Sequence, residues 1–367
     1  MKTNPTVIAL YLPQFHPTDD NNEWWGKGFT EWTNVGKAKR LFRGHVQPHV
    51  PADLGYYDLR LPAVREAQAT MAREHGVDGF CYYHYWFGNG KRQLELPFNE
   101  VLESGSPDFP FCLCWANESW YAKMWNKDGS AEKKPLVEQV YPGASDHVQH
   151  FHSLLPAFQD KRYIRIHGKP LFMIYQPAEL PQVGEFIKLW QKLAEENGLP
   201  GIYFVAHTHR VAKEAQQNFD NGFNAVNSLR LNEAMRRTPP LKKMVTRIVR
   251  TVCNVPRICS YKDVYPFFIG EEEKRAKIFP SLVPNWDHTP RSGTGGSVLV
   301  RATPELFGKH VEQVLGVIAD RDEDENVVFI KSWNEWGEGN YMEPDLQYGT
   351  GYLQELKRAL HAHSRRA

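Results

Sequence analysis

The 367-residue chain has the composition of an ordinary globular protein, with 41% hydrophobic residues, 24% charged residues and a formal net charge of +1. A charge this close to zero excludes a protein whose main partner is a polyanion, so we expect no nucleic-acid partner. The length fits one large barrel or two ordinary domains.

The sequence has no run of eighteen apolar residues, and its N-terminal apolar stretch at 7–12 is short and lies between Pro5 and Pro13. It is too short for a membrane span or a secretory leader, so we predict a cytoplasmic protein. The five cysteines are odd in number and form no Cys-x-x-Cys pair. Such a pattern is typical of reduced thiols rather than of a disulfide framework.

Short apolar or aromatic runs bounded by turn signals recur along the whole chain. They lie at 7–15, 77–86, 111–117, 170–176, 202–207, 223–229, 278–286 and 327–333. Their apolar character is continuous rather than alternating, which is typical of parallel strands that are buried on both faces.

Helical patterns lie between these runs. One begins at Pro62 and stops before Gly76, and another spans 181–197. Thr303-Pro304-Glu305 supplies a cap, a first-turn proline and a first-turn acid for a helix that runs to 319. Eight strands alternating with helices predict an α/β protein, a single (β/α)8 TIM barrel over 1–367 with long loops at the C-terminal face of its strands. A Rossmann sheet is disfavoured because no glycine fingerprint follows the first run.

Residues 230–262 interrupt this regular spacing and predict a basic helical insertion after the sixth strand. Within them, the segment 236–252 interleaves arginines and lysines with apolar residues. Such a helix could rest on an anionic membrane surface, so a peripheral membrane contact is one interpretation. An ordinary solvated surface helix is the other.

Ten of the eleven tryptophans end a predicted strand or lie on the loop after it, and only Trp190 lies in a predicted helix. In a TIM barrel these positions converge on the face that carries active sites, whereas core packing would spread tryptophans over helices and strand interiors. The indoles are therefore predicted to shape sugar subsites. Those assigned to substrate binding are Trp25, Trp32, Trp86, Trp115, Trp286 and Trp336.

The segment 333–344 follows the last apolar run and places Glu335 and Glu338 three residues apart among tryptophans and glycines. Chemistry on a glycosidic bond needs an acid for the leaving oxygen and a second carboxylate for the anomeric centre. We therefore predict Glu335 and Glu338 as the catalytic residues. Gly337 and Gly339 free the backbone locally, so the spacing alone leaves retention or inversion open.

Glu118 follows the third run and offers an alternative catalytic pair with Glu335 on another strand, or else an anchor for a sugar hydroxyl. Further polar residues near strand ends complete the predicted substrate-binding set: His16, Tyr83, His84, Asn117 and Asn334. We expect no metal and no cofactor, because the histidines show no zinc-site spacing. The glycine-rich segment 292–297 lacks the lysine of a phosphate loop, and we interpret it as a flexible loop or lid.

Five segments, at 11–16, 25–32, 79–86, 115–118 and 333–339, carry long specific motifs such as Trp-Asn-Glu-Trp-Gly-Glu-Gly. With them the chain resembles the WbsX-type proteins, the glycoside hydrolase family 99-like proteins encoded with bacterial O-antigen and capsule genes. The resemblance covers nearly the whole chain and is weakest at about 230–275.

This resemblance implies a (β/α)8 barrel that acts on glycans with retention, as α-mannoside enzymes of family 99 do. Carried over, Glu335 would be the base on the sugar 2-hydroxyl, giving a 1,2-anhydro intermediate. Glu338 would be the acid for the leaving oxygen and then the base for the acceptor. The implied partner is a glycan or lipid-linked oligosaccharide of surface-polysaccharide metabolism.

Three functions remain open from the sequence. The same carboxylates could cleave a glycosidic bond or transfer a glycosyl unit to an acceptor. A glycosyltransferase using a nucleotide- or lipid-linked donor is an alternative, although neither a Rossmann fingerprint nor an Asp-x-Asp triplet occurs. A non-catalytic glycan-binding barrel would keep the tryptophans without needing paired acids.

Overall fold

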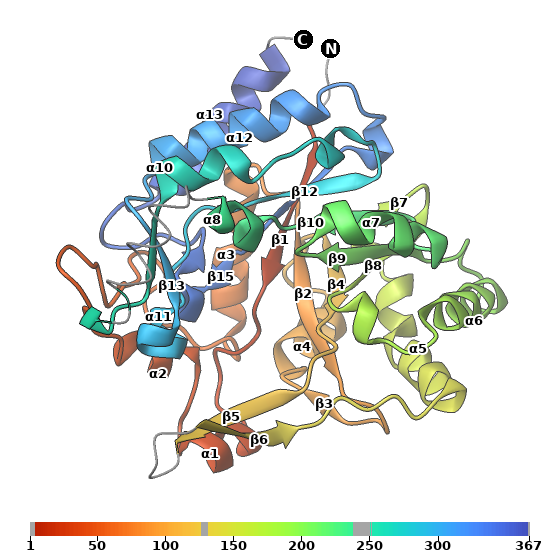
Figure 1. The fold of residues 1–367 in the computed structure, drawn as a ribbon. Helices are drawn as coiled ribbons and strands as arrows, with labels where there is room; N and C mark the ends of the chain where they lie inside the picture. The colour runs from red at the N-terminus through yellow and green to blue at the C-terminus, as the bar shows by residue number, and fades with distance from the viewer. Residues whose placement is uncertain (1–3, 126–130, 238–249, 251, 366–367) are drawn as a thin grey trace.

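A computed structural model describes residues 4–125, 131–237, 250 and 252–365. Within this part of the chain, eight parallel strands close into a barrel (Figure 1), because β1 pairs with both β2 and β14. The strands are β1 (Thr6–Tyr11), β2 (Gly79–Trp86), β4 (Phe111–Trp115), β8 (Lys169–Ile174), β9 (Tyr203–Thr208), β10 (Ala225–Ser228), β12 (Ile278–Leu282) and β14 (Val327–Ile330). The predicted (β/α)8 fold is confirmed.

Every barrel strand overlaps one of the eight predicted runs. Their side chains are almost all buried, because one face fills the barrel and the other packs against helices. This two-sided burial explains the absence of polar alternation in the sequence.

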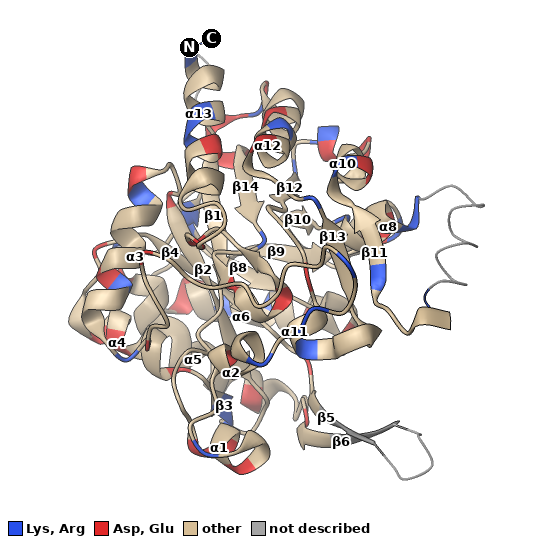
Figure 2. Cartoon of the chain, turned by 90° about the vertical axis from the view of Figure 1, so that its left-hand side faces the viewer, with Lys and Arg blue, Asp and Glu red and all other residues tan. Residues whose placement is uncertain are grey.

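Helices surround the barrel on its outside, and charged residues lie mainly on these helices and the loops (Figure 2). They are α3 (Pro62–Glu74), α4 (Leu96–Ser104), α5 (Ala144–Gln159), α6 (Val183–Glu196), α7 (Val211–Asp220), α12 (Pro304–Ile318) and α13 (Gly351–Arg365). The helix ends predicted from the sequence are accurate to within about two residues. For example, α3 begins at Pro62, and the Thr303 hydroxyl caps α12 by accepting from the Leu306 amide at 3.3 Å.

Short elements extend the loops that follow the strands. They are α1 (Asp19–Trp25), α2 (Glu31–Gly36), β3 (Arg92–Gln93), β5 (Trp120–Trp125), β6 (Ala131–Val137), η1 (Pro177–Glu179), α11 (Thr289–Ser292), η4 (Gly293–Gly295), β13 (Ser297–Val300), β15 (Asn334–Glu335), η6 (Trp336–Glu338) and β16 (Asn340–Tyr341). The β5–β6 hairpin and α1 lie at the end of the molecule opposite the two termini (Figure 1). The remaining short elements are β7 (Arg165–Ile166), η3 (Glu272–Lys274) and η5 (Glu323–Glu325).

After the sixth barrel strand the chain forms α8 (Leu231–Arg236), β11 (Arg257–Ser260), α10 (Tyr261–Val264) and η2 (Tyr265–Phe267). A separate apolar cluster that includes Met235, Tyr261, Phe268 and Leu299 packs this region, and β11 pairs with β13. The predicted basic helix at 236–252 falls mainly on 238–249 and 251, which lie outside the described residues. That helix and the insertion limits 230 and 262 therefore stay predictions.

Two further features bear on the sequence predictions. No helix in the described ranges combines the length and the apolar character needed to cross a bilayer. The five cysteines, all of which lie in the described ranges, form no disulfide there, and Cys81, Cys112 and Cys114 are buried in the barrel.

Candidate active site

The carboxylate segment is tied directly to the neighbouring strand of the barrel. The Trp333 amide donates to the Leu10 carbonyl at 2.7 Å. The Asn334 side chain donates to the Leu12 carbonyl at 3.0 Å and accepts from the Leu12 amide at 2.7 Å. These bonds fix the segment at the end of β1, so the two carboxylates that follow stand at the C-terminal mouth of the barrel.

Glu335 and Glu338 converge on the same two cations. Glu335 contacts the Lys331 ammonium and accepts from the Ser332 hydroxyl at 2.8 Å. Glu338 lies 3.4 Å from the same ammonium and accepts from the Arg291 guanidinium at 2.7 Å. The same Arg291 nitrogen lies 3.7 Å from Glu335. Both carboxylates therefore face one small space, in which Glu335 is buried and the Glu338 side chain is 14% exposed.

Arg291 is held in place by a third carboxylate. Its Nε donates to buried Glu31 at 2.9 Å, and Glu31 comes from α2 after the first strand. The Glu31 carboxylate approaches Gly337 so closely that a Cβ at this position would overlap it. A glycine is therefore required between the two catalytic candidates.

The cations decide the protonation state of Glu338. Burial alone would raise the pKa of this carboxyl, but Lys331, Arg291 and His288 outweigh it and lower the pKa to about 2. Burial lowers the pKa of Lys331, and the charge of Glu338 opposes that effect. Glu338 is thus ionised at neutral pH in the ligand-free protein.

Hydroxyl and ring groups from neighbouring strands line the same mouth. The Tyr83 hydroxyl at the end of β2 accepts from the Lys331 ammonium at 3.1 Å. The Tyr83 and Tyr175 rings lie 5.9 Å apart, and Tyr175 stacks on His207 of β9 at 4.6 Å. Ring faces and hydroxyls of this kind suit a sugar, which has both apolar faces and polar edges.

Glu118 lies on the rim of this mouth. Its exposed carboxylate accepts from the Gln176 amide at 2.6 Å. Partial desolvation raises the pKa of Glu118. The hydrogen bond from Gln176 opposes this rise, and the charge of Glu338 adds to it. The described contacts of Glu335 are with Lys331, Ser332 and Arg291, so the structure pairs Glu335 with Glu338 more closely than with Glu118.

Three predicted substrate contacts face away from the mouth. His84, Trp86 and Trp115 are buried against His150 of α5, with His84 Nε2 at 2.8 Å from His150 Nε2 and the Trp86 ring stacked on His150 at 4.7 Å. Successive strand residues point to opposite faces, so Tyr83 points into the barrel while its neighbour His84 points outward. The packing therefore places these three side chains between the barrel and its helices.

Trp336 is also buried and braces the carboxylate segment. Its ring stacks on Tyr341 at 3.8 Å, and its Nε1 donates to Glu343 at 2.6 Å. Glu343 also accepts from the Tyr57 hydroxyl at 2.9 Å and from the Gln68 amide at 2.7 Å. Burial raises the pKa of Glu343 to about 7, although these hydrogen bonds oppose the shift. This network holds the floor of the site in position.

The other predicted substrate-binding side chains differ in their exposure to solvent. Trp25 is 45% exposed, while Trp32 and Trp286 are half-buried. His16 and Asn117 are buried, and their side chains bond to the backbone, at 3.1 Å to the Pro13 carbonyl and at 2.9 Å to the Gln176 carbonyl. Trp25, Trp32 and Trp286 are the predicted indoles that keep accessible surface.

Lys331, Arg291 and His288 were not predicted from the sequence, and Glu31 was given no role. A signal existed for Lys331, since a lysine within the apolar run at 327–333 is unusual unless it is paired. Glu31 lies inside one of the long motifs. Arg291 and His288 follow the seventh strand and carry no local signal that separates them from other surface cations.

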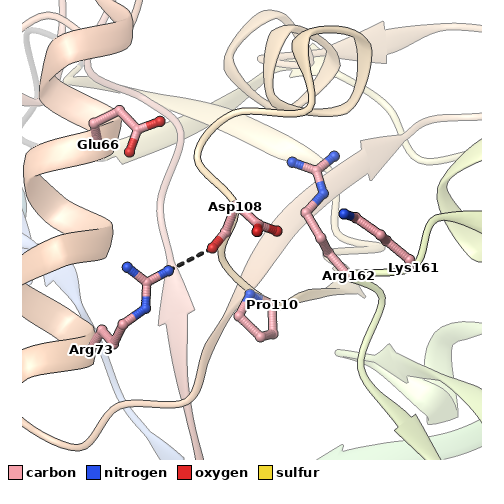
Figure 3. A pocket seen from close by; sticks show the side chains of 6 residues that line it. All are labelled: Glu66, Arg73, Asp108, Pro110, Lys161 and Arg162. Atoms are coloured by element: carbon pink, nitrogen blue, oxygen red, sulfur yellow. Dashed lines mark hydrogen bonds between the residues drawn. The ribbon is translucent and has the colours of Figure 1, made fainter.

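A cavity of about 770 Å³ lies away from the carboxylates (Figure 3). Its lining is Glu66, Arg73, Asp108, Pro110, Lys161 and Arg162. These residues precede the strands, at the opposite end of the barrel. The arginines bond to backbone carbonyls there: Arg73 donates to Asp108 at 2.5 Å and Arg162 to Pro107 at 3.0 Å. The cavity is therefore unrelated to the carboxylate site.

A (β/α)8 barrel with paired carboxylates at its C-terminal mouth is an arrangement that occurs among carbohydrate-active barrel enzymes. The sequence pattern of the family described as Glycosyltransferase WbsX matches residues 7–356. The chain belongs to this family, and it is a carbohydrate-active enzyme.

Related proteins and structures agree with this placement. The chain is 34% identical over 356 residues to protein WxcX of Xanthomonas campestris pv. campestris, an alignment that covers 97% of this chain and 49% of WxcX. The chain thus spans about half the length of the curated relatives it matches.

Two solved structures share the fold at low sequence identity. A GH99 endo-α-mannosidase from Bacteroides thetaiotaomicron superposes with a TM-score of 0.59 at 16% identity, covering 99% of this chain and 98% of that one. A glycoside hydrolase-like protein superposes with a TM-score of 0.60 at 13% identity, covering 98% and 94%. The likeness to both structures concerns the fold.

Proposed function

We propose that this protein cleaves or transfers glycosidic linkages with retention, using Glu335 and Glu338, in the metabolism of bacterial surface polysaccharides. The observation that supports this most strongly is the pairing of the two carboxylates across Lys331 and Arg291 at the barrel mouth. Family membership supports the sugar chemistry, and the shared fold with an endo-α-mannosidase makes an α-mannoside-type substrate the first to test.

The proposed reaction has two steps. Glu335 removes the proton of the sugar 2-hydroxyl, the 2-oxygen forms a bond to the anomeric carbon, and the bond to the leaving oxygen breaks with Glu338 as proton donor. An acceptor hydroxyl then loses its proton to Glu338 and attacks the anomeric carbon, the bond between that carbon and the 2-oxygen breaks, and the 2-oxygen recovers its proton from Glu335. Two inversions at the anomeric carbon give net retention.

The ionised state of Glu338 restricts the first step. A sugar hydroxyl is a poor leaving group without a proton, so Glu338 must gain one before it can act on such a substrate. A leaving group that departs as a stable anion needs no such proton. With Glu338 ionised, the site is suited to the second step, in which Glu338 acts as a base.

Hydrolysis and transfer differ only in whether water or a sugar hydroxyl reaches Glu338 in the second step. The proposed partner is a glycan or a lipid-linked oligosaccharide, and the proposed location is the cytoplasm. A peripheral membrane contact through 236–252 belongs to this proposal, because a lipid-linked substrate would be held at a membrane surface.

A panel of α- and β-glycosyl fluorides, beginning with α-mannosyl fluoride, tests the proposal. Fluoride release reports turnover, and NMR of the first product reports its anomeric configuration. We expect retention, with disaccharide as well as free sugar when acceptors are supplied. First-formed product of inverted configuration would contradict the proposed roles of both carboxylates.

A further inference from the structure

A small cavity adjoins the carboxylate site on the side of the seventh strand. It has a volume of about 290 Å³, and its lining comes from the chain around α11, from β11 and β13, and from the insertion after β10. The lining residues are Arg250, Arg257, Trp286, His288, Ser292, Gly295, Gly296 and Ser297. The glycine-rich segment interpreted above as a lid is thus one wall of a built cavity.

The lining has the chemistry of an anion site. Arg250 and Arg257 bring two guanidinium groups, which bind phosphate oxygens through paired hydrogen bonds. The Arg257 amide donates to the Gly296 carbonyl at 3.0 Å, and its guanidinium donates to the Met235 carbonyl at 2.6 Å, so this arginine is fixed in place. Two serines supply hydroxyls, and none of the described lining residues is acidic.

His288 lies between the cavity and the catalytic candidates. This residue lines the cavity, and its Nε2 lies 3.6 Å from Glu338. Its ring stacks on Trp286 at 5.8 Å with an interplanar angle of 16°, and Trp286 is itself oriented by donating to the Ser297 hydroxyl at 3.0 Å. A group bound in the cavity would therefore lie beside His288 and close to Glu338, the proposed partner of the leaving oxygen.

Nearby carboxylates do not cancel this positive character. Glu31 and Glu338 are paired with Arg291, and Glu335 with Lys331. Asp287 accepts from Thr289 at 2.6 Å and contacts His45 at 2.7 Å. None of the ion pairs among the described residues involves the two cavity arginines, so they add positive charge on this side of the site.

We propose that this cavity binds the phosphate or diphosphate group of an activated sugar donor, which leaves as the anomeric bond breaks. This inference rests on the proposed function of Glu335 and Glu338. In the step, the carbon–oxygen bond at the anomeric centre breaks, its electron pair goes to the phosphate oxygen, and the arginines offset the charge. Such a leaving group departs as an anion, which removes the need for a proton from Glu338.

Isothermal titration of the full chain with inorganic pyrophosphate tests the cavity without requiring turnover. We expect binding that weakens with added salt and that falls roughly ten- to a hundredfold in Arg257→Met, since one charge-assisted contact is lost. Arg250→Met, at an exposed position, should weaken binding without risk to the fold. Arg301→Met removes the same charge from an exposed position that does not line the cavity, and should bind as wild type.

Uridine diphosphate, guanosine diphosphate and farnesyl diphosphate, titrated separately, distinguish the sources of the phosphate. Tighter binding of a nucleoside diphosphate than of pyrophosphate indicates a nucleotide-linked donor, and tighter binding of farnesyl diphosphate indicates a lipid-linked donor. The proposal is overturned if none of the four ligands binds at millimolar concentration, or if both arginine variants bind pyrophosphate as tightly as wild type.

The test of the phosphate site can fail or succeed independently of the test of the proposed carboxylate roles. Glu338→Gln removes a negative charge near the cavity and should keep or strengthen pyrophosphate binding while losing turnover. Loss of turnover together with absent pyrophosphate binding would leave the carboxylate roles standing and reject the phosphate site. Pyrophosphate binding together with full turnover in Glu338→Gln would support the phosphate site and reject the proposed carboxylate roles.

Discussion

The guanidinium of Arg291 donates to Glu338 at 2.7 Å while its Nε donates to Glu31 at 2.9 Å. One side chain from the loop after the seventh strand thereby joins the loops after the first and eighth strands. A buried carboxylate such as Glu338 stays ionised only with partners of this kind. The geometry of the catalytic candidates thus depends on residues far apart in the chain.

Replacing Lys331 with methionine should remove the ammonium that separates the two carboxylates. Each carboxylate then disfavours the charge of the other, so the pKa of Glu338 should rise from about 2. With a donor whose leaving group needs no proton, Glu338 acts only as the base of the second step. The acidic limb of the kcat profile should therefore move to higher pH, and kcat should fall on the order of a hundredfold. Lys309→Met, exposed on α12, is the control. An unchanged profile in Lys331→Met would exclude a role for the ammonium.

Two glycine substitutions should have opposite effects. Gly337→Ala places a Cβ on the Glu31 carboxylate, which must move and release Arg291, so activity should fall sharply. Gly316→Ala, in the last turn of α12 with open space around the new Cβ, should stabilise the protein by about 0.4–1 kcal/mol. Activity and thermal unfolding of both variants check this. A fully active Gly337→Ala protein would show that the Glu31 contact is dispensable.

Glu343 should make stability depend on pH. Its pKa rises from 4.5 to about 7 on folding, so between these values the folded state binds more protons than the unfolded state. Stability from this group is therefore present below about pH 4.5 and lost as pH rises toward 7, by up to about 1.4 kcal/mol per pH unit. Urea unfolding at pH 5 and pH 8 should show a larger loss in wild type than in Glu343→Gln. Equal losses in the two proteins would contradict the shift.

The barrel could be predicted from the sequence because eight buried strands and the helix ends between them leave strong local signals. The run 327–333 and the Thr303 cap are examples, and both lie where expected. The carboxylate pair could be found because both acids lie within four residues in a motif of unusual composition. Local patterns of this kind can be recognised without knowledge of tertiary contacts.

The orientation of the tryptophans could not be predicted for a physical reason. In a strand buried on both faces, inward and outward positions are equally apolar, so the sequence does not tell that Tyr83 faces the site while Trp86 faces α5. Lys331 pairs with Glu335 and Glu338 of its own segment, and its place within an apolar run was a signal that went unused. Arg291 was missed because its importance arises from contacts between loops that follow different strands. Sequence spacing carries no information on those contacts.

Trp25 and Trp115 should separate substrate binding from packing. Trp25→Ala removes an exposed ring on α1 and should raise KM roughly tenfold without loss of stability, if a sugar stacks there. Trp115→Ala opens a cavity between the barrel and α5 and should cost about 3–5 kcal/mol of stability. Steady-state kinetics and urea unfolding of both variants measure this. Unchanged KM in Trp25→Ala would remove that indole from the substrate site.

The turnover rate of Glu338→Gln on a donor that wild type uses tests the central claim most directly. The substitution keeps the shape of the side chain and removes its charge, so the fold, checked by thermal unfolding, should persist. We predict a loss of at least about a thousandfold in kcat with Glu338→Gln, and a smaller loss with Glu118→Gln on the rim. A wild-type rate in the folded Glu338→Gln protein would contradict the assignment of this carboxylate pair.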